Sequence, residues 1–140
     1  MEIKNVLIAL SFLCLTACTG NRAELSSMSG RWIDDRGGSL ILHSNGTFQV
    51  QSIPSTLFFN LSVPTFKGKG IWELKEDSGS WEVQLHFNQI EDNANVAYEA
   101  TVNVAEVSKR KFYLFVWKEE EGGERYKFKK DSFSLNGNQR

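Results

Sequence analysis

The side chains of this sequence that could act as a base, a nucleophile or a metal ligand are few and widely spaced. The two histidines, His43 and His86, fall on expected strands at outward-facing or ambiguous positions. Ser78 belongs to a Ser-Gly-Ser sequence typical of a turn, without the Gly-x-Ser-x-Gly pattern of a hydrolase nucleophile. Asp34 and Asp35 are adjacent, so on a strand they point to opposite faces. Because hydrolysis needs a nucleophile with a base in reach, we expect a protein that is not an enzyme and holds no metal or cofactor.

The composition is that of an ordinary globular domain without a strong charge. The chain has 140 residues, of which 41% are hydrophobic and 24% are charged, and this balance excludes wholesale disorder. Its 16 basic and 17 acidic residues give a net charge of -1. A nucleic-acid-binding domain carries a basic excess, so we expect no nucleic-acid partner. Two cysteines are too few for a disulfide scaffold.

The clearest chemistry in the chain is at Cys18. Lys4 precedes an apolar run of ten residues, 6–15, which as a helix would span about 15 Å, half of the hydrocarbon core of a bilayer. That length predicts a secretory signal peptide and not a membrane-spanning helix. The sequence Leu15-Thr16-Ala17-Cys18 then resembles the bacterial lipobox, in which the cysteine is diacylated and becomes the mature N-terminus. The alternative is an ordinary signal peptide followed by an unrelated cysteine.

The lipobox resemblance implies a division of the chain and a location. Residues 1–17 are then the signal peptide, 18–28 a lipidated tether, 29–131 the domain and 132–140 a tail. Acylation of Cys18 would anchor the protein stably, since two or three acyl chains bind a membrane where one does so marginally. Thr19 follows Cys18 where an aspartate would stand in proteins kept at the inner membrane. By resemblance to Gram-negative lipoproteins, this implies the outer membrane, facing the periplasm or the cell surface.

From Gly30 onward, apolar and polar residues alternate with a period of two, and turn signals recur at short intervals. Asn45-Gly46 is the strongest hairpin signal, because both residues accept the positive φ of a tight turn. The pattern predicts eight strands, at residues 30–34, 39–43, 47–51, 67–74, 80–90, 98–104, 111–118 and 124–130. Short sequential connections favour antiparallel neighbours. We expect an all-β fold, an eight-stranded up-and-down barrel that leaves no free edge, with a two-sheet sandwich as the alternative.

The sequence Gly30-Arg31-Trp32 on the first expected strand resembles the Gly-x-Trp signature of lipocalins and related barrels. The resemblance implies that Trp32 closes the floor of the barrel and that a basic residue from a late strand packs over it. Arg125 is the residue we expect in that role. The resemblance also implies a binding module for a small apolar ligand.

The alternation places nine aromatic residues inside this small barrel. Each ring buries about 150–250 Å², so a filled interior is favoured over a hollow one. A shallow pocket at one open end stays an alternative. The expected inward-facing aromatic residues are Trp32, Phe48, Trp72, Trp81, Phe87, Tyr98, Phe112, Tyr126 and Phe128.

Two segments do not fit a plain barrel. Residues 53–66 form a connection of about fourteen residues, far longer than the others, and they are unusually apolar. This segment either folds back over the barrel or presents an apolar surface to a partner or a lipid. Residues 112–117 are apolar on both faces, so the outer one must be covered by segment 53–66, by the tail with Phe133 and Leu135, or by another protein. We expect segment 53–66 to bury Tyr113, Phe115 and Trp117.

These features lead to three hypotheses of function. The first is binding of a small apolar ligand at the barrel mouth, beneath segment 53–66. The second is a protein-binding inhibitor or immunity lipoprotein, with Phe58, Phe59 and Trp117 as anchors and residues 119–124 as an acidic prong. The third is a structural accessory of an outer-membrane assembly. We expect a monomer, and the candidate binding residues are Leu57, Phe58, Phe59, Leu61, Phe66 and Trp117.

Overall fold

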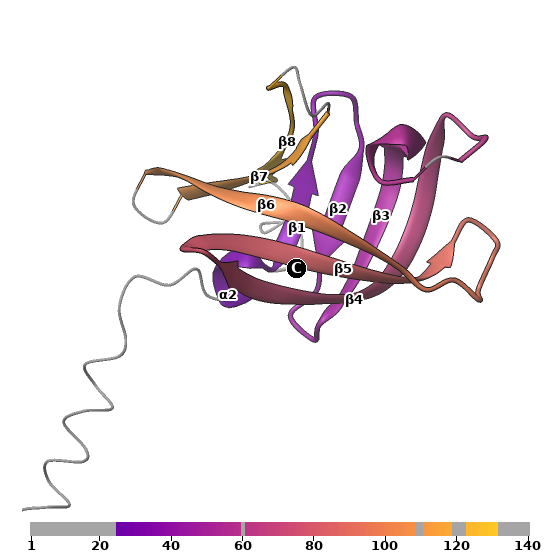
Figure 1. Cartoon of the computed structure of the whole chain (residues 1–140), viewed down its shortest axis with the longest axis horizontal. Helices are drawn as coiled ribbons and strands as arrows, with labels where there is room; N and C mark the ends of the chain where they lie inside the picture. The colour runs from indigo at the N-terminus through magenta and orange to yellow at the C-terminus, as the bar shows by residue number, and fades with distance from the viewer. Residues whose placement is uncertain (1–24, 60, 109–110, 119–122, 132–140) are drawn as a thin grey trace, which may run out of the picture.

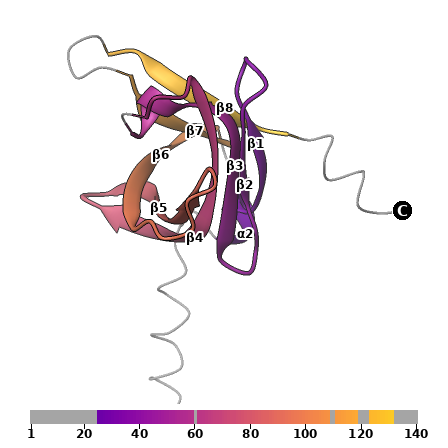
Figure 2. The same ribbon diagram turned by 90° about the vertical axis from the view of Figure 1, so that its right-hand side faces the viewer.

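Eight strands form a closed antiparallel barrel in the computed structural model of the chain. The structure describes residues 25–59, 61–108, 111–118 and 123–131. Each strand pairs with its sequence neighbours, and the first strand also pairs with the eighth. Figures 1 and 2 show the strands following one another around the barrel. The predicted up-and-down barrel is therefore confirmed, and the sandwich alternative is wrong.

The elements follow the chain in order. They are α2 (Leu25–Met28), β1 (Gly30–Ile33), β2 (Ser39–Leu42), β3 (Thr47–Pro54), the 3-10 turn η1 (Ser55–Leu57), β4 (Thr65–Asp77), β5 (Ser80–Ile90), β6 (Tyr98–Ser108), β7 (Lys111–Trp117) and β8 (Arg125–Lys130). All of them lie within residues 25–131, and because the sheet closes on itself the barrel needs no strand from outside this range. The predicted signal peptide, residues 18–24 of the predicted tether, residues 119–122 of the acidic prong and the tail lie outside the described residues.

Strands β3 and β4 are longer than the alternation predicted. The register between them shifts after Val50, and pairing then resumes at Ile53 with Phe66. The shift inserts extra residues, and Ser52 takes a positive φ of 57°, as in a β-bulge. Both Ile53 and Phe66 are buried in the core. The connection between β3 and β4 therefore shrinks to residues 55–64.

Aromatic side chains fill the barrel. Inward-facing Gly68 and Gly70 make room for them on β4: a Cβ on Gly68 would lie 3.0 Å from the ring of Phe87, and one on Gly70 would meet Phe48 and the backbone of His86. Phe48 and Phe87 pack edge to face with ring centroids 4.9 Å apart. The predicted aromatic residues that are buried are Trp32, Phe48, Trp72, Phe87, Tyr126 and Phe128, and Trp81 and Phe112 are partly buried.

Tyr98 is the exception among the predicted inward-facing residues, since 53% of it is exposed. It is the first residue of β6 and pairs in register with buried Phe87, but its side chain lines the open hollow beside the lid. The prediction that Tyr98 belongs to the core is therefore wrong, because alternation gives the face of a residue but not its height in the barrel.

The connections of an up-and-down barrel alternate between its two ends. The end that carries α2, at the left in Figure 1, is called here the α2 end. The other end carries the β3–β4 and β5–β6 connections and is called the lid end. The name lid denotes residues 55–59 and 61–64. The lid is held closed at its base, where Ser55 donates its backbone N–H to Pro64 O at 3.1 Å and its hydroxyl to Val63 O.

The helix α2 closes the α2 end and corrects the predicted tether. Met28 is completely buried, and its carbonyl oxygen accepts a hydrogen bond from Trp32 Nε1 at 2.8 Å. Residues 25–28 are therefore part of the fold, because Met28 supplies an apolar cap for the core beside Trp32. Within the described residues, neither helix has the length or apolar character to cross a bilayer.

Candidate functional site

The basic residue over Trp32 is Lys130, and the expectation of Arg125 in that place is wrong. Lys130 Nζ lies 5.7 Å from the ring centroid of Trp32 and donates a hydrogen bond to Ser27 O at 2.9 Å. Burial lowers the pKa of Lys130 below its ordinary value of 10.5. On β8 the even-numbered residues face inward and Arg125 faces outward. Lys130 and α2 together therefore close this end of the barrel.

The lid end is closed by aromatic side chains of the lid itself. Phe59 contacts Phe66 at 5.6 Å, Phe87 at 5.0 Å and Tyr98 at 5.2 Å between ring centroids. Phe58 contacts Phe66 and Phe87 at 6.4 and 6.2 Å. Of the two expectations for this segment, the one in which it folds back over the barrel is the one that the structure bears out.

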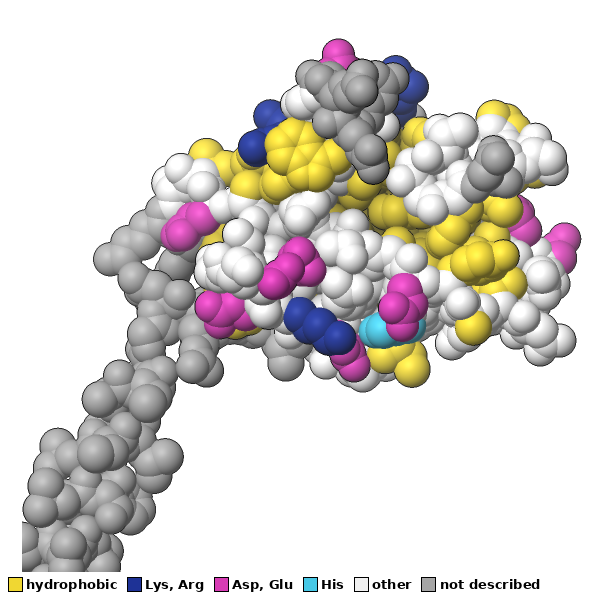
Figure 3. Space-filling model, viewed as in Figure 1, with side chains coloured by type: hydrophobic (Ala, Val, Ile, Leu, Met, Phe, Trp, Pro, Cys, Tyr) yellow, Lys and Arg dark blue, Asp and Glu magenta, His cyan; other side chains and the backbone are white. Residues whose placement is uncertain are grey.

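A hollow of about 560 Å³ lies beside the lid, between it and the β5–β6 connection. Its apolar walls come from Leu61 and Val63 of the lid and from Ile90, Val96 and Tyr98 on the opposite side. Glu91, Asn93 and Asn95 supply polar groups at its rim. Figure 3 shows apolar side chains gathered on the side of this face that carries the β5–β6 connection. The mouth therefore offers an apolar site next to the lid, while the space beneath the lid is filled by Phe58 and Phe59.

The outer face of β7 carries a separate row of aromatic rings. Phe115 packs against Trp117 with centroids 5.4 Å apart, and 47% of Trp117 is exposed. Arg125 Cζ lies 4.4 Å from the ring centroid of Phe115 and 4.7 Å from that of Trp117. Arg125 also donates a hydrogen bond to the hydroxyl of Tyr113 at 2.6 Å. The long side chain of Arg125, which belongs to β8, therefore covers this row of rings.

The expectation that segment 53–66 buries Tyr113, Phe115 and Trp117 is therefore wrong. The rings of the lid contact Phe66, Phe87 and Tyr98 instead. The physical reason is the longer β3–β4 ladder, which brings the lid over the mouth and away from β7. Of the predicted binding residues, the fold brings together Leu57, Phe58, Phe59, Leu61 and Phe66, and it leaves Trp117 apart from them.

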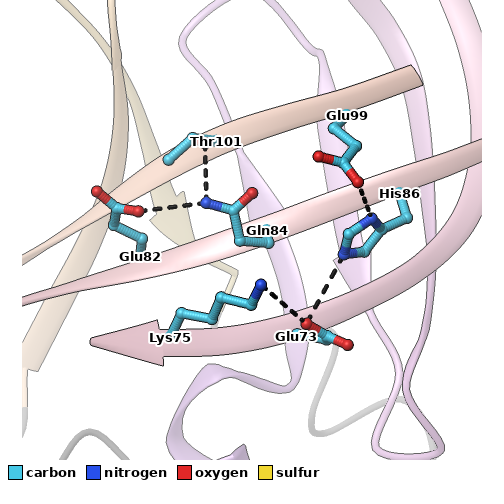
Figure 4. Close-up of polar contacts among 7 residues, drawn as sticks. All are labelled: Glu73, Lys75, Glu82, Gln84, His86, Glu99 and Thr101. Atoms are coloured by element: carbon cyan, nitrogen blue, oxygen red, sulfur yellow. Dashed lines mark hydrogen bonds and ion pairs between the residues drawn. The ribbon is translucent and has the colours of Figure 1, made fainter. Parts of the chain in front are cut away.

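Polar side chains around His86 form a network on the outer face of β4, β5 and β6 (Figure 4). His86 Nδ1 lies 3.0 Å from Glu99 Oε1, and His86 Nε2 lies 3.7 Å from Glu73 Oε2. Lys75 pairs with Glu73 at 3.5 Å. Among the described residues, the ring nitrogens of His86 thus face carboxylates and no nucleophile. The cross-strand pairing of His86 with Glu99 accounts for this arrangement.

Asp34 has a structural role in the β1–β2 turn. Its Oδ1 accepts hydrogen bonds from the backbone N–H of Arg36 at 2.8 Å and of Gly38 at 2.7 Å. Its Oδ2 accepts a hydrogen bond from the hydroxyl of Tyr126. This carboxylate is committed to holding the turn and the first strand against β8. In the part of the chain that the structure describes, no group of three or more acidic, histidine or cysteine side chains could hold a metal ion.

Comparison with known proteins gives no relative from which a function could be inferred, so the inference of function uses the fold and the site alone. No family model, no curated protein and no solved structure matches the chain. Sequence reasoning missed Ile90, Val96 and the exposed ring of Tyr98 as walls of the hollow. The signal for Val96 was available, since it is the one large apolar residue in the connection 91–97.

Proposed function

We propose that the protein is a lipid-anchored protein of the cell envelope whose lipocalin-like barrel, without catalysis, binds a small apolar ligand at its lid end. The observation that carries the proposal is the apolar hollow beside the lid. Its volume of about 560 Å³ falls in the range of small-molecule sites, about 300–1,000 Å³. Each 100 Å² of apolar surface that ligand binding removes from water contributes about 2.5 kcal/mol to the binding free energy.

The ligand lies on the surface of the barrel mouth and not in the barrel interior. The core is filled by Phe48, Phe66 and Phe87, so an interior ligand would have to displace them. Tyr98 offers the ligand an exposed aromatic face, and Asn93 and Asn95 can hydrogen-bond a polar group at one end of it. The site therefore favours a mostly apolar molecule with one polar end.

The test uses the chain beginning at Thr19, which keeps the whole described fold, and the neutral apolar dye N-phenyl-1-naphthylamine. We expect the dye to gain fluorescence on binding, and Tyr98→Ser to weaken that binding about tenfold. The matched control is Ile71→Ser, because Ile71 is equally exposed, at 53%, and is not part of the hollow. Equal affinity of all three proteins, or no binding by any of them, would refute the site.

The lipid anchor is tested separately in the full chain. Cells expressing the wild-type protein or Cys18→Ser are labelled with an alkyne analogue of palmitate and then fractionated. We expect label only in the wild type, and the labelled protein in the outer-membrane fraction. Label that persists in Cys18→Ser would contradict acylation at this residue.

A second candidate function, a protein-binding inhibitor or immunity protein, is favoured by the aromatic row on β7. Exposed Trp117 beside Arg125 has the composition of an interface hot spot. If this function holds, a partner captured from a periplasmic extract is lost with Trp117→Ala and retained with Ile71→Ser. Retention of the same partner by both variants would remove the row as its binding site.

A further inference from the structure

A second groove, on the far side of the barrel from the lid, combines positive charge with an apolar floor. It has a volume of about 820 Å³ and lies at the α2 end, beside β7 and β8. Four lysines line it, Lys111, Lys127, Lys129 and Lys130, together with the rings of Phe112 and Tyr113. Among the residues that the structure describes, its lining contains no aspartate or glutamate. These residues are called here the basic groove.

Three of the four lysines carry their charge toward solvent. Lys111, Lys127 and Lys129 are exposed, and none of them forms an ion pair with a carboxylate of the described residues. Lys127 Nζ instead lies 5.2 Å from the ring centroid of Tyr113. Lys130 is committed to Ser27 and Trp32. The groove therefore presents three uncompensated cations above apolar rings, a surface that complements an anionic amphiphile.

Two carboxylates of the described residues flank the groove without lining it: Glu106, which pairs in register with Phe112, and Asp131, which forms an ion pair with Arg31. Other carboxylates at the same end of the barrel belong to a different edge. Glu76, Asp77 and Glu82 lie on the β4–β5 hairpin, which is separated around the barrel from β7 and β8 by β6 on one side and by β1–β3 on the other. The charge of the α2 end is thus divided, with a basic edge and an acidic edge. An anionic surface would attract the basic edge and turn the acidic edge away.

The chain connection places this end of the barrel next to the proposed anchor. Ser27 of α2 lines the basic groove, and α2 begins at Leu25. Seven Cα–Cα steps separate Leu25 from Cys18, and these span at most about 25 Å when fully extended. Because residues 25–28 are folded, the connection is shorter than the predicted tether. The α2 end cannot leave the neighbourhood of the acylated cysteine, whereas the lid end lies at the opposite end of the barrel.

We infer that the basic groove docks on anionic phospholipid headgroups of the membrane that holds the protein. This inference rests on the proposed anchor at Cys18, which sets the orientation. Lys111, Lys127 and Lys129 lie against the phosphates, and exposed Val107 and the ring of Phe112 lie against the boundary of the acyl chains. Docking directs the lid end and its hollow away from the bilayer, where they are accessible to ligand.

The first test measures binding of the chain beginning at Thr19, without a lipid, to sedimented vesicles. Each lysine near an anionic surface contributes about 1 kcal/mol, which corresponds to about fivefold in partition. We expect binding to vesicles of equal parts phosphatidylglycerol and phosphatidylcholine, and at least tenfold weaker binding to phosphatidylcholine alone. The double variant Lys127→Gln/Lys129→Gln should lose about 25-fold on the anionic vesicles.

The matched control is Lys67→Gln/Lys69→Gln. It removes the same charge from two exposed positions with the same spacing on β4, outside the basic groove. We expect this control to lose less than threefold. Equal losses in the two double variants would mean that net charge alone drives binding, and equal binding to the two kinds of vesicle would exclude recognition of anionic lipid. Either result overturns the inference.

The second test uses the full acylated protein inserted in the same two kinds of vesicle. Its lysines are acetylated briefly with a water-soluble reagent and quantified by mass spectrometry. We expect acetylation of Lys127 and Lys129 to fall at least threefold on the anionic vesicles, while Lys67 and Lys69 do not change. Unchanged acetylation of Lys127 and Lys129 overturns docking and leaves the anchor intact. Failure of the protein to insert in either vesicle overturns the anchor instead, and the first test then decides the groove alone.

Discussion

Replacing Phe59 with alanine tests whether the lid is packed on the barrel in solution. Its ring contacts Phe66, Phe87 and Tyr98 at 5.6, 5.0 and 5.2 Å between centroids. A fully buried phenylalanine costs about 3–5 kcal/mol when truncated to alanine. Phe59 is half-buried, so we expect Phe59→Ala to lower the free energy of unfolding by about 2 kcal/mol. For a domain of this size, that corresponds to a fall in Tm of about 8 °C.

The assay is urea unfolding of the chain beginning at Thr19, followed by tryptophan fluorescence. The control is Val63→Ala, because Val63 lies in the same lid with 38% of its surface exposed and should cost less than about 0.5 kcal/mol. The slope of the free energy of unfolding against urea concentration (the m-value) should be the same in the wild type and both variants, since the surface exposed on unfolding barely changes. If Phe59→Ala costs no more than Val63→Ala, the lid is not packed over the mouth and the position of the hollow is wrong.

Three further perturbations test other parts of the fold. Gly70→Ala should cost about 3 kcal/mol in urea unfolding, because the new Cβ overlaps the carbonyl oxygen of His86 and the backbone must shift; a cost below 1 kcal/mol would contradict the close approach of β4 and β5. In the unfolded chain Lys130 has its ordinary pKa of 10.5, whereas burial lowers this pKa in the folded state. Between the two pKa values the unfolded chain binds more protons than the folded one, so the free energy of unfolding should rise with pH. Between pH 8 and 10.5, the free energy of unfolding should rise less in Lys130→Met than in the wild type. Equal slopes of this free energy against pH in the two proteins would refute burial of the Lys130 amine. Arg125→Met and Trp117→Ala should show a coupling of about 0.5–1 kcal/mol in a double-mutant cycle, and additive effects would show that the stack in the structure is not maintained.

The barrel could be predicted from the sequence because period-two alternation survives in nearly every strand. In β5, for example, Val83, Leu85 and Phe87 are buried and their neighbours are less so. The length of β3 could not be predicted in this way. The bulge after Val50 changes the phase of the alternation, so Ile53 looks like the start of a loop although it continues the same inward face.

The errors at the two ends of the barrel have a different origin. Alternation shows which way a side chain points, but closure of an end depends on which strands reach it. Lys130 shares its inward phase with Tyr126 and Phe128, and Arg125 does not, so the pattern itself favoured Lys130. Met28 gave no such signal, because an isolated apolar residue in a short, mostly polar segment acquires its role only when the fold places it beside Trp32.

A barrel filled with rings restricts where this protein can bind anything. Eight strands leave an interior only wide enough for side chains or one small ligand, and Phe48, Phe66 and Phe87 occupy it. Binding must then use the ends or the outer face, and the two ends differ in chemistry. The α2 end carries the basic groove and continues along the chain toward the proposed anchor at Cys18, whereas the lid end carries the apolar hollow. Because the hollow lies beside the lid and not beneath it, the proposed ligand would not displace the rings of the lid. We therefore expect the stability of lid packing and the affinity for ligand to vary independently.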